Sequence, residues 1–466
     1  MKKTILTSFS LLCAVTMPLM AVDITGDLAS KVRADGKVSV IVTFKDKTNR
    51  GKLGRKGSIQ EVSRTLRANY TVSSRGLKND FAKLGKKADS RILGEFWAAN
   101  ALAAEVSETM LETLKNNPDI AQITLDRVIP FEEPPVDEEA EKADLDGSGG
   151  YTYGLRRLSV DKVREAYNLT GEGVTVGILD TGVDAEHPDL KGKIIGWKDW
   201  SGDDSAEPRD FHGHGTHVAG TIAGGNASGK QIGVAPNAKI IFGRIFSDKG
   251  SATLKGILGA MTWMTDPDGN PETNDAPNIL SNSWGGQQSS MAKEKSMWNL
   301  VKTWRSLNIV PVFAAGNSGP WKNTIGTPGG YPHSFAVGST TSKDRASFFS
   351  SRGPIKWDGV KYIKPDIAAP GSGVYSSMPG GKYTKMSGTS MACPHVAGLS
   401  ALVLEADPSL NVDKLIDLLQ STAKDLGKKG LDKTYGHGRA NIKAAIDKLK
   451  GASSAQTKSF NAIYDR

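Results

Sequence analysis

The feature that most constrains the fold of this chain is a series of short, continuously apolar runs between residues 151 and 450. They are rich in β-branched residues, which is typical of buried strands. Strands that are apolar on both faces need helices on both faces, so the pattern predicts an α/β domain with a parallel sheet. The runs are VTVGILD (174–180), AKIIFGRIF (238–246), NILSNSW (278–284) and NIVPVFAAG (308–316), and helical stretches such as SMWNLVKTWRSL and PHVAGLSALVLEA alternate with them.

Residues 22–131 predict a smaller, separate domain. Val38–Phe44 and Ala98–Val106 are strand-like runs, and a Lys- and Arg-rich stretch with helical spacing lies between them. A capped helix (SETMLETLKNNPDI) and a last strand (AQITLD) follow. The order β-α-β-β-α-β is the ferredoxin-like arrangement, so we expect a small α+β domain.

The first 21 residues have the pattern of an export signal. Lys2 and Lys3 precede a largely apolar stretch (5–17), and Leu-Met-Ala at 19–21 offers a small-residue cleavage site. The apolar stretch is too short for a transmembrane anchor, and nothing comparable follows it. We therefore expect a secreted protein, extracellular or periplasmic, without a membrane anchor.

Residues 132–150 differ sharply from the sequence on either side. They carry eight carboxylates against one lysine, a Pro-Pro pair and terminal glycines. Such a segment cannot bury a core, and exposed linkers are where proteases cut, so we expect an acidic linker that contains a maturation site. The polar residues 451–466 are expected to form a loose C-terminal tail.

The formal net charge of +9 raises the question of nucleic-acid binding. Lys and Arg are scattered along the chain, and no zinc-finger spacing or basic motif with interleaved aromatic residues is present. A solvated basic surface explains the charge better, and no nucleic-acid partner is expected.

Three polar residues fall at the ends of strands and the starts of helices, where a parallel sheet presents reactive side chains. Asp180 ends the run VTVGILD, and His214 lies between two glycines before a helix of small residues. Ser390 follows a glycine turn and opens a helix, whose free N–H groups can stabilise an oxyanion. Each residue alone also has an ordinary structural explanation, such as a turn residue or a helix cap.

His212, His214 and His217 together raise a zinc alternative. The HxHxxH spacing lacks a nearby acidic partner like that of HExxH, which weakens this hypothesis. His212 and His217 are therefore expected to be structural or to face solvent.

Considered together, residues 151–450 resemble the subtilisin-like serine protease family, the subtilases. The chain order Asp, His, Ser is that of subtilisin. The resemblance implies a subtilisin-like parallel sheet flanked by helices and a serine endopeptidase activity on polypeptide substrates. The motifs that carry it are ILDTGVDAEHPDL, HGHGTHVAGTIAG, SNSWGG, AAGNSG and GTSMACPHVAG.

The resemblance also implies a role for each matching residue. Ser390 would be the nucleophile, His214 the general base and Asp180 the residue that orients the imidazole. Asn317, in AAGNSG, would join the Ser390 N–H in an oxyanion hole.

The substrate would bind as an added β-strand. Ser283, Trp284 and Gly285 would line the primary pocket and its neighbour, and the partner segment would lie around Gly250. Gly326 would form the pocket floor. A floor without a side chain implies a roomy pocket, so we expect broad specificity with a preference for apolar or aromatic residues.

The N-terminal domain resembles the subtilase propeptide over the segment AANALAAEVSETMLETLKNNPDIAQITLDRVIP. This implies a zymogen whose propeptide (22–131) is a folding template and an intramolecular inhibitor until the chain cuts itself. No required cofactor is expected, and a monomer is the default expectation.

Many subtilases bind structural calcium. Asp189 matches one common ligand position, but Ala227 stands where the family often has asparagine. The segment 266–275 (DPDGNPETND) is oxygen-rich, yet a solvated turn explains it at least as well. We assign no metal ligands. Cys393, the one cysteine left after the signal is removed, is expected to be a small buried hydrophobe.

Two other hypotheses fit less well. An esterase of the α/β-hydrolase type needs G-x-S-x-G and a histidine late in the chain, but this sequence has GTSMA, and His395 and His437 carry no such pattern. A catalytically inactive binding module on the same fold would have lost a triad or oxyanion residue, and all four are present.

Overall fold

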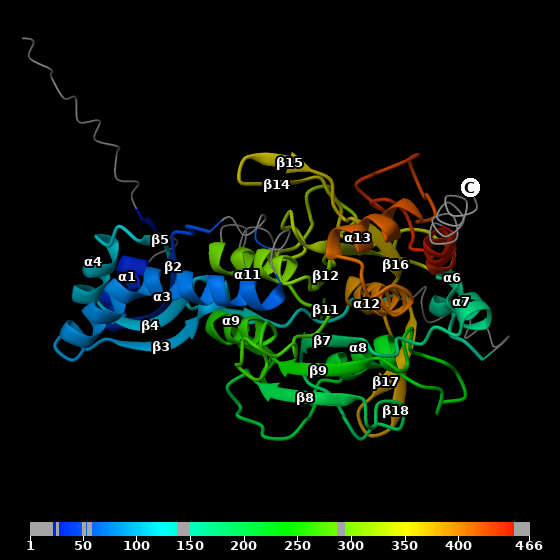
Figure 1. Ribbon diagram of the computed structural model, residues 1–466, viewed down its shortest axis with the longest axis horizontal. Coiled ribbons are helices and arrows are strands. Elements are labelled where there is room, and N and C mark those ends of the chain that lie inside the picture. The colour runs from blue at the N-terminus through cyan, green and yellow to red at the C-terminus, as the bar shows by residue number, and fades with distance from the viewer. Residues whose placement is uncertain are drawn as a thin grey trace, which may run out of the picture.

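The computed structural model describes residues 22–24, 28–48, 53, 58–137, 150–286 and 294–451. The predicted export signal, most of the acidic linker and the end of the predicted tail lie outside these residues. Figure 1 shows a smaller N-terminal domain, blue to cyan, beside a larger domain that runs from green to red. Within the described ranges, no helix combines the length and the hydropathy that crossing a membrane requires.

The larger domain is built on a seven-stranded sheet in the order β16-β13-β12-β11-β7-β9-β8. Every neighbouring pair is parallel, which confirms the prediction from the apolar runs. The strands are β7 (Thr175–Asp180), β8 (Ile194–Asp199), β9 (Lys239–Arg244), β11 (Ile279–Asn282), β12 (Val310–Ala314), β13 (Phe335–Thr340) and β16 (Ile367–Pro370).

Helices cover both faces of this sheet. Successive side chains of a strand point to opposite faces, and the apolar side chains on each face need a helix to bury them. On β7, Val176 and Ile178 pack with two central helices, α8 and α12, whereas Leu179 packs with α9 and α11 on the other face. The helices of this domain include α6 (Tyr153–Arg157), α7 (Val160–Tyr167), α8 (His214–Ala223), α9 (Leu254–Trp263), α11 (Lys295–Ser306), α12 (Thr389–Ala406) and α13 (Val412–Ser421). Two hairpins pair β14 (Ile355–Trp357) with β15 (Val360–Tyr362) and β17 (Val374–Met378) with β18 (Lys382–Met386).

The N-terminal domain contains the predicted β-α-β-β-α-β order as β2-α3-β3-β4-α4-β5. Its sheet has the order β1-β5-β2-β4-β3, with β1 parallel to β5 and the other pairs antiparallel. The sequence pattern had not marked β3, a partly exposed edge strand that contains a glycine. The elements are β1 (Asp23–Ile24), α1 (Leu28–Asp35), β2 (Lys37–Phe44), α3 (Ile59–Leu84), β3 (Arg91–Phe96), the 3-10 helix η1 (Trp97–Ala99), β4 (Ala101–Ser107), α4 (Glu108–Lys115) and β5 (Ile120–Leu125).

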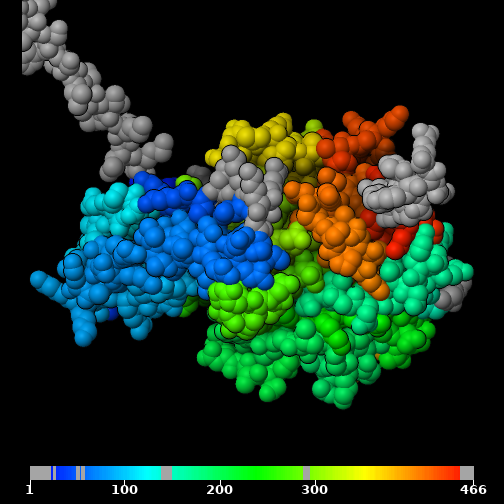
Figure 2. Space-filling model, in the orientation of Figure 1, coloured from blue at the N-terminus to red at the C-terminus, as the bar shows by residue number. Residues whose placement is uncertain are grey.

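The two domains share an extensive boundary. After β5 the chain forms β6 (Val128–Pro130), which pairs antiparallel with β10 (Ser251–Thr253) of the larger domain. On α11, Thr303 Oγ1 and Asn299 Nδ2 donate to carbonyl oxygens of η1 at 2.8 and 3.0 Å. Figure 2 shows the N-terminal domain directly against the green surface of the larger domain.

Candidate active site

Asp180 and His214 meet at the carboxyl edge of the parallel sheet. Asp180 is the last residue of β7, and His214 is the first residue of α8. Gly213 precedes the helix with φ of 91°, a conformation that favours glycine. His214 Nδ1 lies 2.7 Å from Asp180 Oδ1, and both side chains are buried. Within the described part of the chain, His214 Nε2 has no hydrogen-bond partner, so this nitrogen is available to exchange a proton.

Two opposing effects set the pKa of His214. Burial lowers the pKa, because the charged imidazolium loses hydration. The Asp180 carboxylate raises it, with smaller contributions from Asp210 and Glu133, and the net pKa lies above the ordinary 6.5. The environment therefore stabilises the protonated imidazole.

Ser390 lies in the first turn of α12, and it lines a cavity at the same edge of the sheet. Its hydroxyl donates to Ser283 O at 3.1 Å, while Ser283 Oγ donates to Ser390 O at 2.8 Å. The Phe131 ring lines this cavity too, and its centroid lies 5.0 Å from that of the His214 ring. Ser390 thus lines the cavity, with its hydroxyl turned toward Ser283, and the Asp180–His214 pair contacts the Phe131 ring that lines the same cavity.

Asn317 lines the cavity as well. Its Oδ1 accepts hydrogen bonds from the backbone N–H and the hydroxyl of Thr389, both at 2.9 Å. Because the side-chain oxygen is held by these two donors, the Nδ2 amide is the group left to meet a ligand.

Backbone hydrogen bonds join two of the segments that line the cavity. Gly286 and Thr327 exchange two hydrogen bonds, at 3.0 and 2.9 Å, and so join the segment after β11 to the loop that contains Gly326. A Cβ on Gly326 would lie 3.1 Å from Gly286 O, so a side chain there would crowd the cavity. All four predicted substrate-binding residues lie along this wall, namely Ser283, Trp284, Gly285 and Gly326.

A segment of the chain itself lies across the cavity. The resemblance implied an inhibitory N-terminal domain, but the sequence did not identify the residues that enter the cavity. Phe131 and Glu132 line the cavity, and the Phe131 N–H donates to Gly250 O at 2.8 Å. Phe131 also packs edge-on against Phe246 at 5.1 Å. The only sequence signal is the change from the apolar VIPF to the acidic segment that follows it.

The three histidines of HxHxxH do not converge on one point. His212 Nε2 contacts the Glu133 carboxylate at 3.0 Å, whereas His217 Nε2 lies 2.9 Å from Val374 O. Burial lowers the pKa of His217 to about 3, so it stays neutral. The described residues therefore give no support to the zinc alternative.

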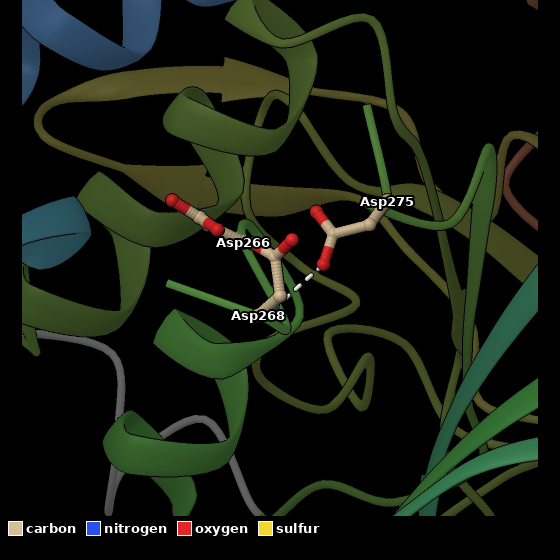
Figure 3. A group of neighbouring side chains, drawn as sticks. All are labelled: Asp266, Asp268 and Asp275. Carbon is tan, nitrogen blue, oxygen red and sulfur yellow. Dashed lines mark hydrogen bonds between the residues drawn. The ribbon is translucent and has the colours of Figure 1, made fainter. Parts of the chain in front are cut away.

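A cluster of aspartates lies away from this cavity, at the domain boundary (Figure 3). Carboxylate oxygens of Asp266, Asp268 and Asp275 lie within 4.8 Å of one another and could hold a metal ion. Asp275 Oδ2 accepts the Asp268 N–H at 2.7 Å. The buried Asp266, however, is paired with the guanidinium of Arg67 from α3 of the N-terminal domain. A cation thus already contacts the cluster in this state.

Asp189, the other calcium candidate, accepts a hydrogen bond from a protein donor on each of its two oxygens. Its Oδ1 accepts the backbone N–H of Ala227 at 2.7 Å, and its Oδ2 accepts the Tyr383 hydroxyl at 2.7 Å. Gln231 Nε2 donates to two carbonyls of the adjoining loop, those of Gly224 and Gly233, at 2.8 and 3.1 Å. These bonds direct N–H and O–H groups at the oxygens that a calcium ion would need, so the site does not suit calcium.

Cys393 is buried on α12. Its Sγ lies 3.7 Å from Asn282 O, and burial raises the pKa of the thiol to about 12. A thiol with so high a pKa is not a nucleophile at neutral pH.

Comparison with known proteins agrees with this geometry. Residues 171–438 match the model of the subtilase family, Peptidase_S8. The chain is 38% identical to subtilisin DY of Bacillus licheniformis over 296 residues, which cover 63% of this chain and 97% of that protein. It is 34% identical to the serine protease AprX of Bacillus subtilis over 390 residues, covering 78% of this chain and 83% of that protein.

A longer relative matches almost the whole chain. Bacillopeptidase F of Bacillus subtilis is 31% identical over 476 residues, which cover 91% of this chain but only 32% of that protein, so this chain spans about a third of its length. The family match agrees with the parallel sheet flanked by helices. This chain belongs to the subtilase family and is a subtilisin-like serine endopeptidase.

Proposed function

We propose that Asp180, His214 and Ser390 are the catalytic triad of this endopeptidase. The observation that carries the proposal is the 2.7 Å bond between Asp180 and His214 beside the cavity that Ser390 and Asn317 line. For the reaction the Ser390 hydroxyl would leave Ser283 O and donate to His214 Nε2, which has no hydrogen-bond partner among the described residues. Ser390 Oγ then attacks the scissile carbonyl carbon as His214 accepts its proton.

Asp180 keeps Nδ1 protonated, so that Nε2 is the basic nitrogen, and it stabilises the imidazolium that forms. The oxyanion is held by the Ser390 N–H at the start of α12 and by Asn317 Nδ2. His214 then protonates the leaving amine. Water then attacks the Ser390 ester as His214 accepts its proton, and Ser390 Oγ leaves and takes that proton back, which releases the acid product.

Substrate specificity follows from the cavity walls. The segments at Gly285 and Gly250 offer backbone groups to an extended peptide, which favours tolerance of many sequences. Around Gly326 the described lining residues carry no charged group other than Glu132, which lies on the segment that crosses the cavity. This supports the expectation of broad cleavage with an apolar or aromatic preference.

We further propose that the chain is made as a zymogen. Residues 1–21 would direct export, residues 22–131 would be the inhibitory propeptide, and 151–450 would be the catalytic domain. The support is that the segment after β6 crosses the cavity and covers His214 with Phe131. A peptide substrate cannot occupy the same space until this segment leaves.

Structural calcium is proposed for the aspartate cluster alone, and only after the N-terminal domain has left. Asp266, Asp268 and Asp275 would supply the oxygen ligands, and the ion would stabilise this loop without any part in catalysis. With Arg67 in place the cluster is already neutralised in part.

The test is to purify the full chain and a Ser390→Ala variant from a protease-deficient host. The wild-type protein should cut itself, digest casein and be labelled by a fluorophosphonate, while the variant should stay uncut and unlabelled. Self-cleavage by Ser390→Ala at the wild-type rate would overturn the mechanism. An inert but folded wild-type protein would favour the inactive binding module.

A further inference from the structure

The segment from Val128 to Asp137 runs through the active site in the manner of an extended peptide. On one side of the cavity, β6 pairs antiparallel with β10, and Pro130 lies opposite Ser251. The pairing continues one residue further, because the Phe131 N–H donates to Gly250 O at 2.8 Å. The backbone is therefore anchored in register up to Phe131.

Phe131 occupies the position beside the base. Its ring lies edge-on to His214 and to Phe246, at 5.0 and 5.1 Å. Side chains alternate along an extended strand, so the side chain of the next residue, Glu132, belongs to the opposite side of the segment. Glu132 does line the cavity together with Ser390, Asn317 and Gly326.

The chain continues without a break beyond the cavity. The Glu133 carboxylate lies 3.0 Å from His212 Nε2, two residues before His214. Further on, Asp137 Oδ2 accepts the hydroxyl of Ser387, three residues before Ser390, at 3.4 Å. These contacts hold the segment on both sides of Glu132, whose side chain lines the cavity together with Ser390.

We propose that the chain cuts itself between Glu132 and Glu133, an inference that rests on the proposed function. Ser390 Oγ bonds to the carbonyl carbon of Glu132, and the bond to the nitrogen of Glu133 breaks. The departing amine takes its proton from His214. Water then releases the N-terminal fragment with a new carboxylate at Glu132.

The Glu132 side chain should slow self-cleavage of the bond between Glu132 and Glu133. None of the described residues that line the cavity is basic, so a carboxylate gains no counter-charge there. Replacing Glu132 by an uncharged apolar residue removes the free-energy cost of desolvating the carboxylate. Glu132→Leu should therefore shorten the half-time of self-cleavage by about tenfold, which corresponds to about 1.4 kcal/mol of barrier.

The experiment follows self-cleavage of the full chain after dilution from denaturant. Samples are quenched with acid, and the C-terminal residue of the N-terminal fragment is identified by mass spectrometry. The C-terminus of the N-terminal fragment is decisive. The acidic segment at the start of the C-terminal fragment can be trimmed by later cuts. The first N-terminal fragment should end at Glu132, and its complement should begin at Glu133.

Two matched variants test the position of the cut. Glu133→Pro places an imino acid after the scissile bond and should abolish the fragment that ends at Glu132. Val136→Pro puts the same change at an exposed residue three positions later and should leave the cut unchanged. A melting curve of each variant shows whether it has folded, and the fragment from the wild-type chain is decisive even if a variant does not fold.

The outcomes separate this inference from the proposed function. A first fragment that ends at another residue, or one that still ends at 132 in Glu133→Pro, overturns the inference and leaves the protease intact. A wild-type chain that folds but cuts neither itself nor casein overturns the proposed function.

Discussion

The imidazole of His214 and the carboxylate of Asp180 are joined by a 2.7 Å hydrogen bond, although the two residues are 34 positions apart in the sequence. The bond fixes the ring, and Nε2 has no hydrogen-bond partner among the described residues. Asp180→Asn should keep the fold but favour the wrong tautomer, and kcat on a chromogenic peptide should fall by roughly 10,000-fold. Glu172→Gln, at an exposed position, is the control and should leave kcat unchanged. A kcat within tenfold of wild type for Asp180→Asn would remove Asp180 from the triad.

The raised pKa of His214 predicts the acidic limit of activity. A general base works only when it is neutral, so kcat/KM should fall as the pH drops through the pKa of His214. Because Asp180 and Asp210 keep that pKa above 6.5 despite burial, the fall should begin at neutral pH. A pH profile of kcat/KM for the processed enzyme measures this limit. Full activity maintained down to pH 5 would show that His214 is not the base.

Four of the seven strands, β9, β7, β11 and β12, could be predicted because they are apolar runs, and the long sequence motifs located the candidate site residues. Strands β13 and β16, and the partly exposed edge strand β8, were not among the predicted runs. Edge strand β3 was missed because exposure on one side removes the apolar run. The occupation of the cavity by Phe131 was also missed. It depends on pairing between segments about 120 residues apart, β6 and β10, which no local pattern encodes.

Arg67 should contribute more than Arg64 to the binding free energy between the N-terminal domain and the larger domain. Arg67 pairs with the Asp266 side chain, which is only 5% exposed, whereas Arg64 and Glu272 are both more than half exposed. Removing one partner of a buried pair costs about 3 kcal/mol, while an exposed pair is worth less than about 1 kcal/mol.

The two variants therefore make a matched test of inhibition. Arg67→Ala should weaken inhibition of the processed enzyme by its own N-terminal domain by about 100-fold, and Arg64→Ala by less than about fivefold, as these energies imply. The measurement is the inhibition constant from residual peptidase activity in the cleaved mixture. Equal effects of the two variants would show that the burial of Asp266 does not govern the contact.

The environment of Asp189 predicts that this region stays folded without calcium. Asp189 already accepts the Ala227 N–H and the Tyr383 hydroxyl, each at 2.7 Å, so both of its oxygens have a protein donor without an ion. In the Ser390→Ala chain, where Arg67 also contacts the aspartate cluster, a chelator should therefore leave Tm unchanged. Tyr383→Phe should lower the free energy of unfolding by about 1 to 3 kcal/mol, because it leaves a buried carboxylate oxygen without a donor. Calorimetry with and without EDTA, and urea unfolding of both proteins, provide the measurements. A fall in Tm on chelation that Asp189→Asn abolishes would mean that an ion displaces these donors.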